Sequence, residues 1–279
     1  MNTRLYNWFD RVITLGDYQG ATVSNHFFKM LYISTQSPLK FNIEGEKLIC
    51  RTALIPAHSN IPIQIGEGTN CWIGLDFLDV DSYWLKKNYT FQKKGDILYN
   101  FEPHLKFEYF VNSIINNSSI SHAEKAFRKL VNPNNFPINT IKMDSRILGY
   151  LIHTALTQNS SEKLKDAAAF CNMSASNFRH VFKDNTGLNY SNFRIAIKLK
   201  LFCKIFSQTG SLMRSAVGSG FYDMPHLIRT FQSYFGRSPG VDFIKTLELK
   251  FSDNVDDYLL DIPGPKSFLK SHLKKDVDF

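Results

Sequence analysis

Two stretches in the second half of the chain repeat one pattern of residues, and this repeat constrains the fold more than any other feature. In residues 164–187 and 212–236, apolar residues recur at helical spacing on either side of a short turn. Ala168 and Ala216 are 48 positions apart before the turn, whereas matching positions after it are 49 apart, so the second turn holds one extra residue. The repeat predicts two helix-turn-helix units.

The residue types at the two turns agree with this prediction. A sharp turn between helices needs a residue that tolerates a positive φ, and Asn172 and Gly220 are suited to it. Ser174 can cap the helix after the first turn, and Pro225 fits a first helical turn, where its missing N–H costs no hydrogen bond. The second helices of the two units are therefore expected at residues 176–185 and 225–235.

The residues expected on the outer faces of these second helices are cationic or hydrogen-bonding, and none of those selected is a carboxylate. The pairs Phe178/Phe182 and Leu227/Phe231 fix each helix to the core and thereby decide which side chains face outwards. Such faces suit the major groove of DNA, and two ordinary amphipathic helices are the alternative. The outward residues are Ser176, Asn177, Arg179, His180 and Lys183 in the first unit, and His226, Arg229, Gln232 and Ser233 in the second.

The positive charge of the chain is concentrated in the same region. Residues 141–250 contain 15 Lys and Arg against 7 Asp and Glu, whereas residues 1–140 contain 14 against 12. A basic segment of the size of a domain points to nucleic acid, and a solvated basic surface is the alternative on charge alone.

From about Met143 to Phe243 the sequence resembles the AraC/XylS family of bacterial transcription regulators. The strongest part is residues 216–239, with Gly220-Phe221, Arg229-x-Phe231 and Gly236-x-x-Pro239 at the spacing of the family. The sequence departs from the family pattern at several positions, among them Ala167, where a larger aliphatic residue is usual, and Leu227, where phenylalanine is usual. Asn172 replaces a usual glycine, Pro225 replaces a serine that can contact phosphate, and Phe202 replaces an alanine of the linker helix.

The resemblance implies an α+β fold of two domains. Residues 1–135 would form a mainly β, cupin-like barrel plus a helix, which binds an effector or dimerises. Residues 140–245 would form an all-α DNA-binding domain whose linker helix, residues 190–206, joins the two helix-turn-helix motifs, and residues 246–279 a C-terminal tail. A linker of this length spans about 25 Å. The two units could then enter successive major grooves, about 34 Å apart, and read an asymmetric site.

The resemblance also implies roles for single residues. Ser176, Arg179 and His180 match base-reading positions in the first unit, and His226 and Arg229 match them in the second. Lys183 and Gln232 lie further along each helix, where backbone contacts are expected, and Lys198 on the linker is expected to reach phosphate. The implied partners are double-stranded promoter DNA, RNA polymerase, a small-molecule effector and a second copy of the chain. Activation is the commoner mode of action in this family.

The first half of the sequence is typical of a β domain. Short apolar runs such as Phe27–Ile33 and Cys71–Leu75 are separated by turn residues, and Glu44–Lys47 is typical of a hairpin turn. Residues 97–111 fit a strand or a helix equally well, whereas His122–Val131 fits a helix that ends at an Asn/Pro cluster. This pattern is consistent with a barrel or sandwich.

Residues of catalytic chemistry do not form a recognisable set. His26, His58 and His104 are isolated from one another, so a metal site is not expected. Cys50, Cys71, Cys171 and Cys203 form no CxxC pair and are expected to be reduced thiols. We expect a protein that is not an enzyme and has no cofactor. The sequence shows neither a signal peptide nor a long apolar run, which predicts a cytoplasmic protein that does not associate with a membrane and is bound to the nucleoid when it is on DNA.

Two other functions remain open at this point. One is a cupin-type metalloenzyme with an attached DNA-binding domain. The other is an interaction protein or a DNA binder of low specificity, in which the altered first unit no longer reads bases.

Overall fold

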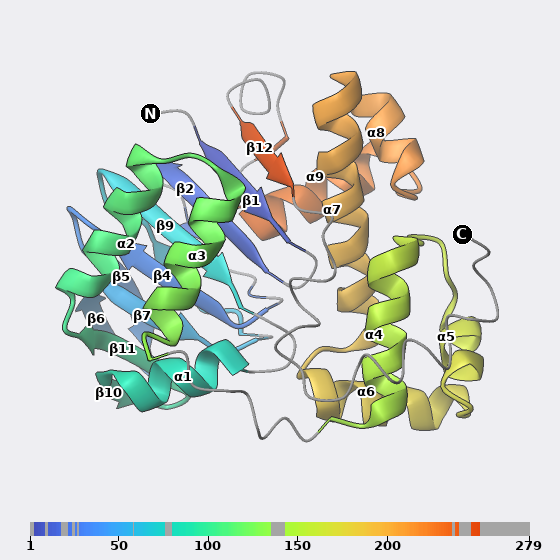
Figure 1. Ribbon diagram of the computed structural model, residues 1–279, viewed down its shortest axis with the longest axis horizontal. Coiled ribbons are helices and arrows are strands. Elements are labelled where there is room, and N and C mark those ends of the chain that lie inside the picture. Colours follow the sequence, from blue (N-terminus) through green and yellow to red (C-terminus); the bar gives the residue numbers. More distant parts are fainter. Residues whose placement is uncertain are drawn as a thin grey trace.

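The chain folds into a β-rich N-terminal domain and a helical C-terminal domain, which lie side by side (Figure 1). The computed structural model describes residues 3–8, 11–17, 22–23, 26, 28–57, 59–75, 80–134, 143–235, 238–239 and 247–251. The predicted mixed α+β class is confirmed, with the helical domain where the repeat places it. The predicted tail beyond residue 251 and Gly236 of the Gly236-x-x-Pro239 motif lie outside the described residues.

The strands form two sheets. The larger has the order β10-β11-β7-β4-β9-β2-β1-β12, and the smaller has the order β3-β8-β5-β6. The strands are β1 (Arg4–Asn7), β2 (Val12–Asp17), β3 (Thr22–Val23), β4 (Met30–Ser34), β5 (Leu39–Ile43), β6 (Glu46–Cys50), β7 (Thr52–Ile55), β8 (Ile63–Gln64), β9 (Thr69–Gly74), β10 (Thr90–Lys94), β11 (Ile97–Glu102) and β12 (Glu248–Phe251).

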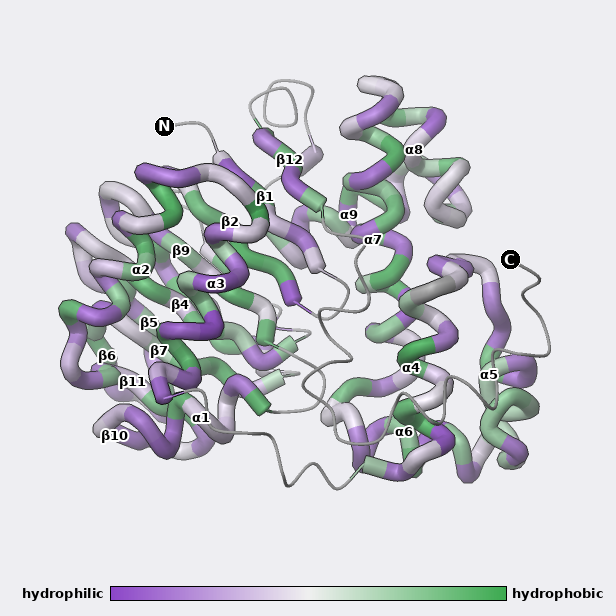
Figure 2. Tube along the Cα trace, viewed as in Figure 1, coloured by the Kyte–Doolittle hydropathy of each residue, from purple (hydrophilic) through white to green (hydrophobic). Residues whose placement is uncertain are grey.

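Both faces of the large sheet are buried, because apolar side chains on its central strands alternate between two cores. In β4, Leu31 and Ile33 point into one core and Tyr32 into the other. The second core lies between the two sheets, since it joins Tyr32 with Phe41 and Ile63 of the smaller sheet. The hydrophobic colouring in Figure 2 follows these central strands.

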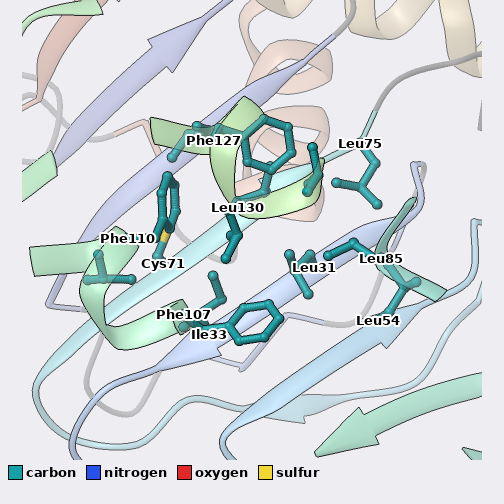
Figure 3. Close-up of a cluster of buried hydrophobic side chains, with 14 of the residues drawn as sticks. Leu31, Ile33, Leu54, Cys71, Leu75, Leu85, Phe107, Phe110, Phe127 and Leu130 are labelled. Carbon is teal, nitrogen blue, oxygen red and sulfur yellow. The ribbon is translucent and has the colours of Figure 1, made fainter. Parts of the chain in front are cut away.

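Three helices cover the other face of the large sheet. They are α1 (Val80–Asn88), α2 (Leu105–Asn116) and α3 (Ile120–Val131). Phe107 and Phe127 from these helices belong to the same buried core as Leu31 and Leu54 of the sheet (Figure 3). The N-terminal domain therefore has three layers, namely the small sheet, the large sheet and the helices.

The C-terminal domain consists of helices that match the predicted pattern closely. They are α4 (Ser145–Thr157), α5 (Leu164–Phe170), α6 (Ala175–Thr186), α7 (Tyr190–Thr209), α8 (Leu212–Gly218) and α9 (Met224–Phe235). The side chain of Asp144 caps α4 by accepting a hydrogen bond from the N–H of Arg146, as its position before the helix predicts. Helix α8 begins at Leu212, the start of the second repeat in the sequence. Helix α7 extends three residues beyond residue 206, where the linker helix was predicted to end.

The two domains share an apolar interface. Leu5 of β1 is buried in the same core as Leu199 and Phe202 of α7, and the rings of Phe28 and Tyr234 have their centroids 6.2 Å apart. After α9 the chain returns to the N-terminal domain, where β12 pairs with β1 in parallel as the edge strand of the large sheet. The helical domain is thus joined to the N-terminal domain both by this apolar interface and by strand β12, which follows it in the sequence.

Several elements differ from the sequence prediction. The ambiguous residues 97–111 contain both a strand, β11, and the start of helix α2, with Pro103 between them. Strand β8 covers only two residues. No helix among the residues that the structure describes is long and apolar enough to cross a bilayer.

Candidate nucleic-acid interface

The turns of the two predicted units have the same hydrogen bonds. In the first, the N–H groups of Asn172 and Met173 donate to the carbonyls of Ala169 and Ala168, at 3.0 and 2.9 Å. In the second, the N–H groups of Gly220 and Phe221 donate to the carbonyls of Val217 and Ala216, each at 3.0 Å. This pair of bonds is the Schellman arrangement, which requires a left-handed residue after the helix. Asn172 and Gly220 have φ values of 53° and 79°, as predicted.

The second helix of each unit begins with an equivalent cap. Ser174 accepts at its Oγ from the N–H of Asn177 at 3.2 Å, and Asp223 accepts at Oδ1 from the N–H of His226 at 2.6 Å. Between turn and cap, the second unit has one residue more than the first. This extra residue is Tyr222, whose exposed fraction is 93%.

The apolar residues that anchor the second helices are buried, so the opposite faces are exposed. Phe178 and Phe182 of α6 and Leu227 and Phe231 of α9 have no accessible surface. His226 and Ser233 of the predicted set are half-buried. The predicted residues that are exposed are Ser176, Asn177, Arg179, His180 and Lys183 on α6 and Arg229 and Gln232 on α9. Both faces thus combine cations with hydrogen-bonding groups, which suits phosphates and base edges.

Lys198 of the linker helix has a partner within the domain. Its Nζ donates to the carbonyl of Gly220 at 2.6 Å and lies 5.9 Å from the centroid of the Phe221 ring. Partial burial and the charge of Arg194 lower the pKa of Lys198. Lys198 therefore ties α7 to the second turn, and its predicted phosphate contact stays a prediction.

Helix α7 sets the separation of the two units. It has 20 residues, which corresponds to about 30 Å. Phe202, which occupies the position where the family usually has alanine, is buried between Phe206 and Phe231, with ring centroids 6.1 and 6.0 Å away. The larger side chain fills the contact between α7 and α9, so it makes α9 part of the same rigid core.

A buried polar network fixes α7 to the first unit. Arg194 is only 7% exposed, and its Nη1 lies 3.8 Å from Oε2 of Glu162. The hydroxyl of Tyr150 donates to Glu162 at 2.5 Å and lies 3.1 Å from the hydroxyl of Tyr190. Neither Nη atom of Arg194 has a hydrogen-bond partner among the described residues. Sequence reasoning missed this arginine, which lies within an otherwise apolar helix face.

A small cavity lies between the two domains. Its volume is about 60 Å³, and its lining is mostly apolar, with Trp8 and Phe28 from the N-terminal domain and Ala196 and Tyr234 from α7 and α9. The indole N–H of Trp8 is buried without a hydrogen-bond partner among the described residues. Nowhere among the residues that the structure describes are three His, Cys, Asp or Glu side chains placed to hold a metal ion.

Known proteins match this chain in its second half and in its overall fold. Residues 167–242 match the family described as "Helix-turn-helix domain". An apo ToxT variant from Vibrio cholerae strain SCE256 has 13% identity and a TM-score of 0.53, with 85% of this chain and 97% of that chain covered. ToxT from Vibrio cholerae O395 has 14% identity and a TM-score of 0.52, with 85% and 98% covered.

A third similar structure is wild-type ToxT from strain SCE256 with a bound unsaturated fatty acid. It has 12% identity and a TM-score of 0.51, with 84% of this chain and 95% of that chain covered. None of the curated proteins matches the sequence. At these identities the ToxT structures establish the fold alone, whereas the family match covers both of the turns described above. Residues 167–242 are therefore an AraC-type helix-turn-helix domain, and the chain is a DNA-binding transcription regulator with a two-domain fold like that of ToxT.

Proposed function

We propose that this regulator reads an asymmetric promoter site of about two helical turns, with α6 and α9 in successive major grooves. The observation that carries the proposal is the repeated turn geometry at the two ends of a linker helix of about 30 Å. This length is close to the 34 Å of one turn of B-DNA. Equivalent positions on the two helices carry different side chains, Asn177 against His226 and Lys183 against Gln232, so the two half-sites should differ in sequence.

The proposed contacts divide into two kinds. Ser176, Arg179 and His180 of α6, together with His226 and Arg229 of α9, contact base edges, where guanidinium and imidazole groups meet guanine acceptors. The other members of the set contact the phosphate backbone and fix the register without reading sequence. They are Lys183, Gln232, Lys198 and Asn177, and we add the exposed Tyr222 to them.

DNase footprinting of the full chain on genomic fragments tests this proposal. The expected result is a discrete protected region of about two turns, without internal symmetry, whose affinity falls as salt rises. Uniform protection of all fragments would support the DNA binder of low specificity instead. A protected inverted repeat would show that two copies bind symmetrically, and would contradict reading of the site by one chain.

We also propose that the regulator is an activator that contacts RNA polymerase. This part rests on the family resemblance alone. Transcription in vitro from a footprinted promoter tests it, because an activator raises the amount of transcript at a fixed polymerase concentration. A decrease in transcript would identify a repressor.

The interdomain cavity is our candidate for an effector site. Its apolar lining and the Trp8 N–H, which has no hydrogen-bond partner among the described residues, suit an apolar molecule with a hydrogen-bond acceptor, such as the unsaturated fatty acid bound to ToxT. Arg11 in its wall is already paired with Asp81, at 2.6 Å between Nε and Oδ2. A cavity of about 60 Å³ is far smaller than such a molecule, whereas ligand sites usually measure about 300–1,000 Å³. Binding would therefore have to move α7 away from the sheet.

Movement of α7 on ligand binding would let the effector control the arrangement of the two domains. A ligand shifts an equilibrium only if it binds one arrangement better than the other, and a ligand that widens the interface satisfies this condition. Titration of the full chain with an unsaturated fatty acid, monitored by tryptophan fluorescence, should give saturable binding. Ala196→Trp should weaken this binding by filling the cavity. Equal binding by that variant would place the effector elsewhere.

A further inference from the structure

The surface of the N-terminal domain that faces away from the sheet contains a groove between α2 and α3. Its volume is about 580 Å³, nearly ten times that of the interdomain cavity. The two helices are joined by three residues and pack against one another, so they run antiparallel (Figure 1). The lining of the groove includes Leu105, Lys106 and Tyr109 of α2 and Lys125, Lys129 and Leu130 of α3.

The floor and rim of the groove are apolar. Phe110 and Leu130 form part of the buried core beneath it. Leu105 and Tyr109, one turn apart on α2, are 74% and 73% exposed. Large apolar side chains gathered on one exposed surface typically mark an interaction site. No described residue covers these two side chains to any large extent, so the groove is open to a partner.

The charges around the groove all have one sign. Lys106 stands on the α2 side, and Lys125 and Lys129, one turn apart, stand on the α3 side, with no carboxylate among the described residues of the lining. The carboxylates on these helices point to other cations. Glu108 lies 3.7 Å from Arg51 and Glu124 lies 3.0 Å from Arg128, so neither neutralises the lysines of the groove.

We propose that the α2–α3 groove binds an acidic amphipathic helix of a partner protein. Two antiparallel helices leave a channel between them that a third helix fills. From Leu105 to Ser113 the groove runs for about 12 Å, which matches helix anchors at positions i, i+3, i+4 and i+7. Lysines on both sides select a helix whose apolar stripe has Asp or Glu on each flank.

A second copy of this chain is a poorer occupant. A two-fold dimer places the same patch on both sides of the interface, so the lysines of one groove would meet only groups that this patch itself carries. Among the described residues, the lining contains no carboxylate that could pair with these lysines across such an axis. A partner with the opposite charge meets the same apolar floor without this repulsion.

A binding experiment with the full chain tests the proposal. The probe is a fluorescent synthetic peptide of 14 residues, with Leu at the four anchor positions and Glu on both flanks, and a scrambled peptide of the same composition is the reference. Fluorescence anisotropy should show saturable binding of the amphipathic peptide, at least tenfold tighter than the scrambled one and weaker at high salt.

Charge-reversed variants locate the binding site. Lys125→Glu/Lys129→Glu should weaken peptide binding at least tenfold. The control Lys47→Glu/Lys93→Glu makes the same change of net charge on exposed lysines of β6 and β10, and should leave binding unchanged. Tyr109→Ser should weaken binding without loss of fold, because the side chain is mostly exposed.

Three results would overturn the proposal. The first is equal binding of the amphipathic and scrambled peptides, and the second is equal weakening by the two charge reversals. The third is a dimer in sedimentation that becomes a monomer on Lys125→Glu/Lys129→Glu, which would show that a second copy occupies the groove. None of these readouts uses DNA, so they are independent of the proposed promoter site.

Discussion

Arg4 in the first strand and Glu248 in the last form an ion pair, with 2.9 Å between Nε and Oε2, although 244 positions separate them in sequence. The guanidinium of Arg4 also donates to the carbonyls of Ile114 and Ile115 at the end of α2. The pair thus joins three segments, namely the N-terminal strand, the end of a covering helix and the strand that follows the DNA-binding domain. Strand β12 is therefore part of the N-terminal sheet, whereas the sequence placed it in a separate tail.

The ion pair predicts a pH dependence of stability. The hydrogen bond from Lys250, and to a smaller extent the hydrogen bond from Arg4, lower the pKa of Glu248 below 4.5. Because the folded-state pKa is the lower one, this stabilisation is complete above about pH 4.5 and is lost as the pH falls through the folded-state value. Glu248→Gln should lower the urea midpoint at pH 7 and make a smaller difference at pH 3.

The control for this experiment is Glu44→Gln, in the exposed turn between β5 and β6. Glu248 is partly exposed, so the expected difference at pH 7 is small. The same difference between wild type and Glu248→Gln at pH 7 and pH 3 would mean that the ion pair does not stabilise the fold.

The arginines and the lysine of the proposed DNA interface should behave differently when removed. Arg179→Ala or Arg229→Ala is expected to weaken binding to the specific site by about 1–3 kcal/mol and to leave binding to random duplex almost unchanged. Lys183→Ala should weaken both kinds of binding similarly and reduce the salt dependence. Fluorescence anisotropy on the footprinted site and on a random duplex measures both. Equal losses on the two duplexes for the arginine variants would contradict their proposed role in reading bases.

The helical domain could be predicted from sequence because local rules decide it. The turn residues Asn172 and Gly220, the cap at Ser174 and the spacing of buried phenylalanines each act within a few residues. The exposed positions of the candidate site follow directly from that spacing. The change of spacing from 48 to 49 also revealed an added residue, although only the structure identifies it as the exposed Tyr222.

The parts that sequence reasoning missed depend on distant partners. Strands β1 and β12 are four residues each, and they are strands because they pair with one another and because β1 also pairs with β2. Arg194 was missed because its burial depends on Glu162, from a loop thirty-two positions earlier. The α2–α3 groove was missed for the same reason, since residues 97–111 alone did not distinguish a strand from a helix.

The left-handed turn of the second unit gives a test of its geometry. At Gly220, φ is 79°, and an added Cβ would lie 3.1 Å from Oγ of Ser160. Gly220→Ala should therefore lower the free energy of unfolding by about 1–2 kcal/mol, because a left-handed conformation is strained for alanine. Asn172→Gly should be tolerated, since asparagine already adopts φ of 53° there and glycine adopts it freely. Urea unfolding measures both variants, and an unchanged stability of Gly220→Ala would mean that the turn relaxes.

The buried pair of Arg194 and Glu162 should show strong coupling. Arg194→Met removes a cation that lacks hydrogen bonds at both Nη atoms, but it leaves Glu162, whose side chain is 10% exposed, without its counter-charge. Glu162→Gln leaves the arginine buried and unpaired, which should cost about 3–5 kcal/mol. The double variant Arg194→Met/Glu162→Gln removes both charges, and should be close to wild type in stability. Urea unfolding of the four proteins gives the coupling energy, and additive losses in the double variant would show that the two charges do not interact.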